Sequence, residues 1–412
     1  MFAGFFAPIW FALIGMALVG LLTALGGLLG TPLALIRVWA TERQTKATEE
    51  GLITDRINKA VEGLGTEKTV KADGEERTEP NIEVRIGALY ALERISQDSE
   101  RDHKRIMEIL CAYIRENSAI STANSVPSPP FFSTSSDLPT VTKWVSDMVA
   151  FKGKELWPWC KRQKPRTDIQ AALDVLGRRS SEKRIFEAQD SQHDTQSRFV
   201  FDFAPASIES TAKETAEWIK ECDRYAGYRL DLRETNLQGA DLSGLDFNGA
   251  RLNGSKLNGA CMEGTQLNGA QMWACEFQGA TMKRAQFIGA DLRTTKFLGS
   301  DLVGANLQAS VMSFDKIQRP FLGNSHLNWA AIWKTDLRKF CEPQKISAAQ
   351  LAYMFADSSL TLPEGTDRPK EWPPQDINSS ENIYDIHSGL DFLGEWKRWM
   401  SDPAGYIPPQ TR

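Results

Sequence analysis

The most regular feature of the chain is a large hydrophobic residue at every fifth position from Leu232 to Leu337. All 22 of these positions hold Leu, Phe, Met or Ile, and a small residue stands two places before 18 of them. Glycine stands two places after eleven of them. A period of five matches neither the 3.6 residues of an α-helix turn nor the two-residue period of a strand. The pattern therefore predicts a short extended piece followed by a turn, repeated many times.

Segments such as TNLQGADLSG and AQFIGADLRT resemble the pentapeptide-repeat family. The resemblance implies a right-handed four-sided β-helix in which four units make one coil. Residues twenty apart would then stack, which places Phe277 on Phe297. The small position Ala270 would point inward, and Asn268 would face outward. At about 4.8 Å per coil, the 22 units would form five and a half coils and a rod roughly 26 Å long.

One side of this expected rod carries side chains of the kind found at protein interfaces. Arg233, Trp273 and Arg293 each follow a large residue on the same side. Trp and Arg are the residues most enriched at binding hot spots, so we interpret these three as candidate partner-binding residues. Trp329 and Trp333, near the end of the repeat, are expected instead to pack beneath the C-terminal segment and close the coil.

Upstream of the repeat, apolar residues recur at helical spacing. The residues around Ser99 predict a capping box between two helices, and Asp168 is expected to cap a third core helix. His103, at a helix start, is expected to be solvated. Two runs are similar to a helical segment of membrane-anchored bacterial pentapeptide-repeat proteins, namely EVRIGALYALERISQDSERDHKRIMEILCAYIREN and DIQAALDVLGRR. The tail from Ile346 is similar to a segment that often follows such repeats, and DFLGEWKRWM predicts an amphipathic helix against the rod.

The N-terminal segment has no charged side chain before Arg37, and residues 8–30 are almost entirely apolar. These 23 residues would make about 34 Å of helix, enough for a hydrocarbon core of roughly 30 Å. We expect one transmembrane span in a bacterial inner membrane, with the lipid bilayer as its partner. The positive charges follow the span, which predicts a cytoplasmic C-terminal bulk. Gly26 and Gly30 have a GxxxG spacing that could allow spans to associate, although lipid-facing small residues are the commoner interpretation.

The predicted fold class is mixed: a single N-terminal transmembrane helix, an α-helical segment and a right-handed four-sided β-helix. The expected boundaries are an anchor at 1–38, a helical region at 39–117, a Ser/Pro-rich linker or insertion at 118–166, a helical region with an insertion at 167–227, the pentapeptide-repeat β-helix at 228–340, and a C-terminal capping segment and tail at 341–412.

Composition excludes several function classes. The 412 residues include 53 acidic and 48 basic side chains, a balance that does not favour general nucleic-acid binding. Six cysteines lie far apart with no CxxC pair, and with four histidines they predict neither a metal site nor a disulfide framework. A phosphate-binding loop at residues 63–69 fails because Glu67 stands where Walker A requires glycine. We expect no catalytic residues and no cofactor.

These observations favour a non-enzymatic, membrane-tethered scaffold that presents the β-helix to a protein partner in the cytoplasm. No nucleic-acid partner is expected, and a homo-oligomer stays possible. The alternative is a membrane effector of a bacterial stress or phage-defence system. A weaker alternative is a topoisomerase-directed DNA mimic, as the resemblance suggests. Residues 228–340 contain thirteen Lys/Arg and ten Asp/Glu, a net charge of +3 that disfavours DNA mimicry.

Overall fold

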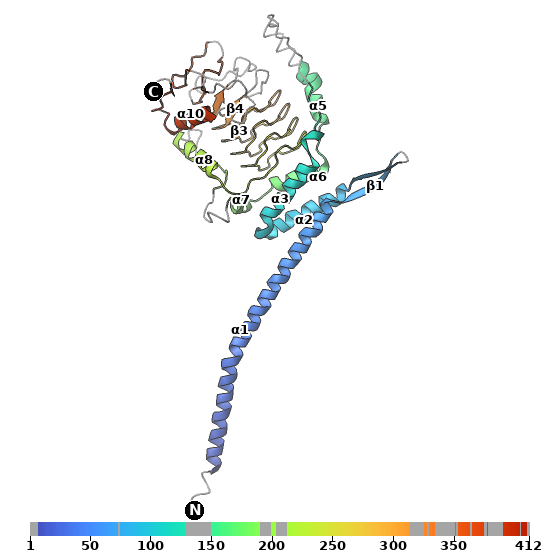
Figure 1. Cartoon of the computed structure of the whole chain (residues 1–412), viewed down its shortest axis with the longest axis vertical. Helices are drawn as coiled ribbons and strands as arrows, with labels where there is room; N and C mark the ends of the chain where they lie inside the picture. Colours follow the sequence, from blue (N-terminus) through green and yellow to red (C-terminus); the bar gives the residue numbers. More distant parts are fainter. Residues whose placement is uncertain are drawn as a thin grey trace, which may run out of the picture. The chain divides into compact units, whose positions relative to one another are not determined.

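The computed structural model (Figure 1) describes residues 7–72, 75–127, 150–189, 199–202, 212–313, 325–327, 329–333, 351, 353–362, 365–374, 377, 390–403 and 405–409. The chain divides into two compact units, Met1–Glu62 and Gly63–Arg412. Almost all of the first unit belongs to helix α1 (Ala7–Leu64), which is 58 residues long.

The N-terminal helix does not match the expected anchor. Within the described part of the chain, no helix is both long and apolar enough to cross a bilayer. A span needs about 20 apolar residues. The same helix then continues without a break through charged residues from Arg37.

The prediction of a single-pass transmembrane helix through residues 8–30 is therefore wrong. The inner-membrane location that depended on this span is wrong with it, and the predicted bilayer partner has no support. Gly26 and Gly30 lie within α1, but their surroundings fall outside the described side chains.

The second unit begins with a β-hairpin and a helical region. The hairpin pairs β1 (Glu67–Ala72) with β2 (Glu75–Pro80) in antiparallel register. Helices α2 (Ile82–Asp98) and α3 (Glu100–Asn117) pack on each other and on α6 (Thr167–Gly177). The predicted cap at Ser99 is confirmed, because its hydroxyl accepts a hydrogen bond from the Asp102 amide. Short elements complete the region: η1 (Ile120–Thr122), η2 (Lys152–Leu156), α5 (Trp157–Arg162) and α7 (Ser181–Ala188).

Asp168 does not cap α6, contrary to the prediction. It lies in the first turn and is fully buried, and it accepts hydrogen bonds from Arg166 Nε at 2.7 Å and from the Tyr113 hydroxyl. Burial alone would raise the pKa of Asp168, but the hydrogen bonds and the Arg166 charge outweigh it and lower that pKa. Asp168 therefore ties α6 to α3.

His103 is also buried rather than solvated, with 1% of its surface exposed. Its Nδ1 lies 2.6 Å from Ser96 Oγ, and its Nε2 lies 2.8 Å from Glu187 Oε1. The side chain therefore joins α3 to α2 and α7, a packing relation that a local sequence pattern does not reveal.

The repeat region winds into a β-helix with twenty residues per coil. Parallel bridges join residues twenty apart, as in the series Asp231, Arg251, Gln271 and Asp291. Three later coils add a small parallel sheet of β3 (Asp291–Leu292), β4 (Val311–Ser313) and β5 (Ala331–Trp333). The predicted coil of four units is thus confirmed.

The interior of the coils also follows the prediction. The small inward positions from Ala240 to Ala290 are at most 1% exposed, and Ala270 is among them. Phe277 and Phe297 stack with ring centroids 5.3 Å apart and an interplanar angle of 14°. This stack fills the core of the coils, as expected.

The helical region closes the first coil of the rod. Three amides of that coil find acceptors there: Asn236 N donates to Ser118 O, Asp241 N to Gln170 Oε1 and Asp246 N to Gly177 O, at 2.7–3.0 Å. In later coils the equivalent amides bond to the preceding coil. The helices therefore supply the acceptors of a missing coil.

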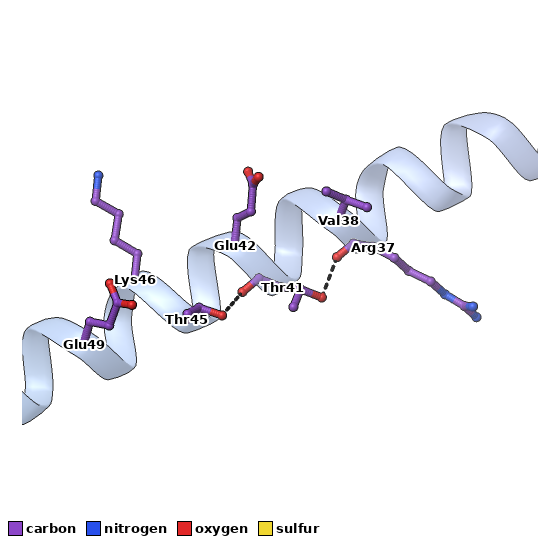
Figure 2. A pocket seen from close by; sticks show the side chains of 7 residues that line it. All are labelled: Arg37, Val38, Thr41, Glu42, Thr45, Lys46 and Glu49. Carbon is purple, nitrogen blue, oxygen red and sulfur yellow. Dashed lines mark hydrogen bonds between the residues drawn. The ribbon is translucent and has the colours of Figure 1, made fainter.

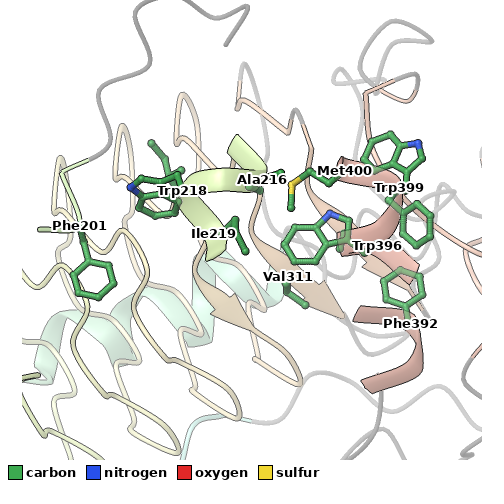
Figure 3. Close-up of a cluster of buried hydrophobic side chains, with 13 residues drawn as sticks. Phe201, Ala216, Trp218, Ile219, Val311, Phe392, Trp396, Trp399 and Met400 are labelled. Atoms are coloured by element: carbon green, nitrogen blue, oxygen red, sulfur yellow. The ribbon is translucent and has the colours of Figure 1, made fainter. Parts of the chain in front are cut away.

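The C-terminal segment covers the other end of the rod. Phe355 pairs with Ala331, and Trp329 packs on Tyr353 and Trp399. Closure by Trp329 is confirmed, whereas the Trp333 side chain lies outside the described residues. Helices α8 (Ala212–Arg224) and α10 (Leu390–Ser401) contribute to one buried apolar cluster with the rod, shown in Figure 3. The predicted C-terminal amphipathic helix is α10.

Candidate interaction surface

The coil has four corners, each formed by the turn after a large inward residue. We name them by one member: the Gly239 corner (239, 259, 279, 299), the Gly244 corner (243–244, 263–264, 283–284, 303–304), the Gly249 corner (249, 269, 289, 309) and the Trp273 corner (233–234, 253–254, 273–274, 293–294). The second turn residue has a positive φ throughout, between 53° and 72°.

Two corners are covered by other segments of the chain. At the Gly239 corner, a Cβ added to Gly259 would lie 2.9 Å from Cys160 Cβ, and one added to Gly299 would lie 2.7 Å from Leu156 Cδ2. At the Gly249 corner, added Cβ atoms would meet Phe201 and Trp218 at 2.3–2.4 Å. Glycine is therefore required here both for its positive φ and for close approach.

Among the residues that the structure describes, no segment covers the glycines of the other two corners in this way. A Cβ on Gly244 or Gly264 would have nothing within 4 Å. The Trp273 corner replaces three of its glycines by Glu234, Ala274 and Thr294, at φ of 56–59°. A residue with a Cβ in this conformation costs roughly 1–2 kcal/mol. At the remaining glycine of this corner, Gly254, the nearest described atom to an added Cβ is Glu234 Cγ at 3.5 Å, an ordinary contact.

The structure brings together the three candidate partner-binding residues, Arg233, Trp273 and Arg293, which we call the stripe. Successive coils place four residues in one row: Arg233, Asn253, Trp273 and Arg293. The coils are joined by hydrogen bonds of 2.9–3.0 Å from Glu234 N to Asn253 O, from Gly254 N to Trp273 O and from Ala274 N to Arg293 O. Arg233 is exposed, and Trp273 and Arg293 are half-buried. Whether they bind a partner remains a proposal.

Both arginines of the stripe are held by an aspartate two residues earlier. Arg233 donates from Nε and Nη2 to Asp231 at 2.7 and 2.8 Å, and Arg293 does the same to Asp291 at 2.9 and 2.7 Å. The hydrogen bond from Arg233 is the main cause that lowers the pKa of Asp231. Sequence reasoning missed these pairs, although the repeated Asp-Leu-Arg at 231–233 and 291–293 was a usable signal.

Asn253 was also missed and differs from the other asparagines at its place in the repeat. Asn248, Asn258 and Asn268 each accept a hydrogen bond from an amide of the next coil, at 2.7, 2.9 and 3.0 Å. Asn253 is 8% exposed, and within the described structure its Oδ1 has no hydrogen-bond partner. A buried acceptor left unpaired costs about 1–3 kcal/mol.

The prediction for Asn268 is corrected by the same observation. Asn268 is 4% exposed, and its Oδ1 accepts a hydrogen bond from the Ile288 amide, so it does not face solvent as expected. We call Asn248, Asn258 and Asn268, which bond to the next coil in this way, the asparagine ladder. The repeat pattern identifies the apolar interior but does not distinguish exposed polar positions from those that bond to the next coil.

Charges beside the Trp273 corner are unevenly paired. The carboxylates Asp231, Glu276 and Asp291 each lie within an ion pair. For Arg251 and Lys256, the described residues offer no oppositely charged group within 4.0 Å. They flank Asn253 on either side of the corner.

Other features offer less chemistry. The described residues hold no group of three or more His, Cys, Asp and Glu side chains that could bind a metal ion. Burial raises the pKa of the Cys111 and Cys160 thiols to about 11, so both stay protonated at neutral pH. A surface hollow along α1, between Arg37 and Glu49, is lined by that helix alone (Figure 2).

Comparison with known proteins identifies the repeat. A family model for pentapeptide repeats matches residues 231–269 and 275–313, in eight copies. The coiled region is a pentapeptide-repeat β-helix. A search of curated proteins finds no match to the chain.

Solved structures similar to the chain include two pentapeptide-repeat proteins and a resistance protein. One from the Arabidopsis thaliana thylakoid lumen is 24% identical, with 23% of this chain and 66% of that one covered and a TM-score of 0.15. HetL from the cyanobacterium Nostoc is 23% identical, with coverages of 32% and 72% and a TM-score of 0.16. QnrB1, a plasmid-mediated fluoroquinolone resistance protein, is 15% identical, with coverages of 32% and 75% and a TM-score of 0.19. At these TM-scores the matches add no argument beyond the repeat itself.

Proposed function

We propose that the chain is a non-enzymatic interaction scaffold whose pentapeptide-repeat β-helix presents the Trp273 corner to a protein partner. One observation carries the proposal: the described segments of the chain cover two corners, whereas they leave the half-buried Trp273, with Arg233 and Arg293 in line with it, on a corner that they do not cover. An uncovered aromatic side chain beside fixed guanidinium groups is typical of a binding hot spot.

Topoisomerase-directed DNA mimicry has weaker support. A DNA mimic needs a strongly acidic surface, whereas residues 228–340 carry thirteen basic and ten acidic side chains. The carboxylates beside the Trp273 corner are, in addition, neutralised by paired cations.

The proposal can be tested by placing a photo-crosslinking amino acid at position 273 of the full chain in its native cells. We expect a covalent adduct with a discrete partner at position 273, and none at the control position 283 on the Gly244 corner. Trp273→Ala should reduce recovery of that partner by about thirtyfold while leaving the melting temperature unchanged, since a buried interface tryptophan contributes 2 kcal/mol or more. Unchanged recovery, or a loss explained by unfolding, would contradict the proposal.

A further inference from the structure

We propose that the partner binds the Trp273 corner as an extended peptide segment that carries an acidic side chain close to an apolar one. This inference rests on the proposed function and names the class of partner. Three features of the corner support it: its unpaired charges, an unpaired acceptor and the shape of its turns.

The charges favour an acidic ligand. Arg251 and Lys256 lie on either side of Asn253 and, in the described structure, neither has an ion-pair partner. Three nearby carboxylates are already paired, namely Asp231, Glu276 and Asp291. Glu234 is the opposing unpaired charge, so the corner has an excess of available cations. A carboxylate from a partner would complement Arg251 and would share Lys256 with Glu276, whose pKa the Lys256 charge already helps to lower.

The unpaired acceptor favours a ligand with a free N–H. Asn253 Oδ1 is buried and has no donor in the described structure, whereas the equivalent oxygens of Asn248, Asn258 and Asn268 each have one. An extended peptide has main-chain N–H groups that are not used internally. An α-helix has none free beyond its first turn. Because Oδ1 has almost no exposed surface, the Asn253 side chain would have to turn outward to accept this bond from a peptide amide.

The shape of the corner also disfavours a docked helix. At the Gly239 corner, a helical segment approaches so closely that Cβ atoms would clash, for example Gly259 against Cys160. The Trp273 corner carries Cβ atoms at Glu234, Ala274 and Thr294, which prevent the same approach. An extended strand rises about 3.3 Å per residue, so side chains two residues apart are about 6.6 Å apart and lie over different coils, which are about 4.8 Å apart. The acidic residue would lie beside Arg251 and Lys256. The apolar residue would pack on Trp273, one coil further along the rod.

The test uses a phage-displayed library of random twelve-residue peptides, selected on the immobilised full-length protein. We expect enriched sequences with Asp or Glu one or two residues from an aromatic or aliphatic side chain. A synthetic enriched peptide, measured by fluorescence anisotropy, should bind the double variant Arg251→Glu/Lys256→Glu at least tenfold more weakly. The same peptide with Lys in place of its acid should regain affinity for that variant. The matched control Lys283→Glu, on the Gly244 corner, should leave binding unchanged.

The outcomes separate this inference from the proposed function. Enrichment of basic peptides, or equal binding of the enriched peptide to the charge-reversed variant, would overturn the extended acidic ligand. No enrichment at all would also overturn it. If position 273 still crosslinks a partner in any of these cases, the scaffold function stands and only the partner class is wrong. If crosslinking fails as well, both proposals fall.

Discussion

At the scale of single residues, the corner glycines meet two separate demands, which a matched pair of substitutions can distinguish. Gly259 and Gly264 have nearly equal φ of 71° and 67°, but only Gly259 faces a neighbour, Cys160. We expect Gly264→Ala to lower the free energy of unfolding by about 1–2 kcal/mol, from backbone strain alone. Gly259→Ala should cost clearly more, because its Cβ also meets Cys160. Urea unfolding of both variants checks this, and equal losses would show that Cys160 yields without cost.

The asparagine ladder gives a second matched pair. Asn268→Ala removes the acceptor of the Ile288 amide and should destabilise the protein by about 1–3 kcal/mol. Asn253→Ala removes a buried acceptor that has no donor in the described structure, so it should leave stability unchanged or raise it. Thermal melts followed by circular dichroism would compare the two. If Asn253→Ala proved the more destabilising change, the proposed unpaired state of Asn253 would be wrong.

The sequence was informative about the inside of the coils and much less so about polar residues. The period of five reports burial directly, because one large side chain per unit must fill the same column, and Ala270 and Phe277 follow it. The placement of Asn268 depends on a bond to a residue one coil away, which the period does not encode. The candidate stripe could be predicted from stacking alone, but not the unpaired state of Asn253.

At the scale of elements, the joint between α6 and α3 depends on the buried carboxylate of Asp168. Its pKa is lowered from the ordinary 3.8, because hydrogen bonds and the Arg166 charge overcome the effect of burial. A group whose pKa is lower in the folded state contributes stability above its unfolded pKa, and that contribution is lost as the pH falls through the folded value. We therefore expect Asp168→Asn to destabilise the protein at pH 7. The difference from wild type should shrink as the pH falls below about 3.8.

Denaturant unfolding of both proteins from pH 7 down to pH 3 would measure this dependence. Asp174→Asn is a suitable control, since Asp174 lies on the same helix and bonds to Gln170 rather than to a guanidinium group. A constant difference between wild type and Asp168→Asn at every pH would exclude the ionised carboxylate as the source of the effect.

Element positions could be predicted where a local pattern was sufficient. The cap at Ser99 and helix α10 follow from neighbouring residues. The covered corners could not be predicted, because the residues that cover Gly259 and Gly249 come from Cys160 and Phe201, distant in the sequence. The expected transmembrane span was inferred from missing charges and a count of apolar residues, and within the described residues no helix is long and apolar enough to cross a membrane.

At the scale of the whole molecule, both ends of the β-helix are closed by the chain itself. Helix α10 buries Phe392, Trp396 and Trp399 in the cluster that covers the last coils. Deleting residues 390–412 should expose this apolar surface and cause concentration-dependent association. Light scattering would detect it. Lys397→Ala, which removes only an exposed ion pair with Asp223, should stay monodisperse in the same way as the full chain. A monodisperse truncated protein would show that other segments suffice for closure.

The helical segment at residues 152–163, which packs on the Gly239 corner, can match only a limited number of coils, because its own repeat differs from that of the β-helix. One turn of α-helix rises about 5.4 Å, whereas one coil rises about 4.8 Å, so the two repeats drift apart by roughly 0.6 Å per coil. After about four coils the helix is displaced by half a coil spacing. Its side chains would then lie between the corner glycines and not over them. The segment contacts four coils, from Gln163 at Gly239 to Leu156 and Lys152 at Gly299. Its turn over the last coil, Lys152–Leu156, is a π-helix, which has more residues per turn than an α-helix. A straight helix can therefore pack on this corner over only about four coils. A longer β-helix would need a second helical segment whose first turn again lies over a corner glycine.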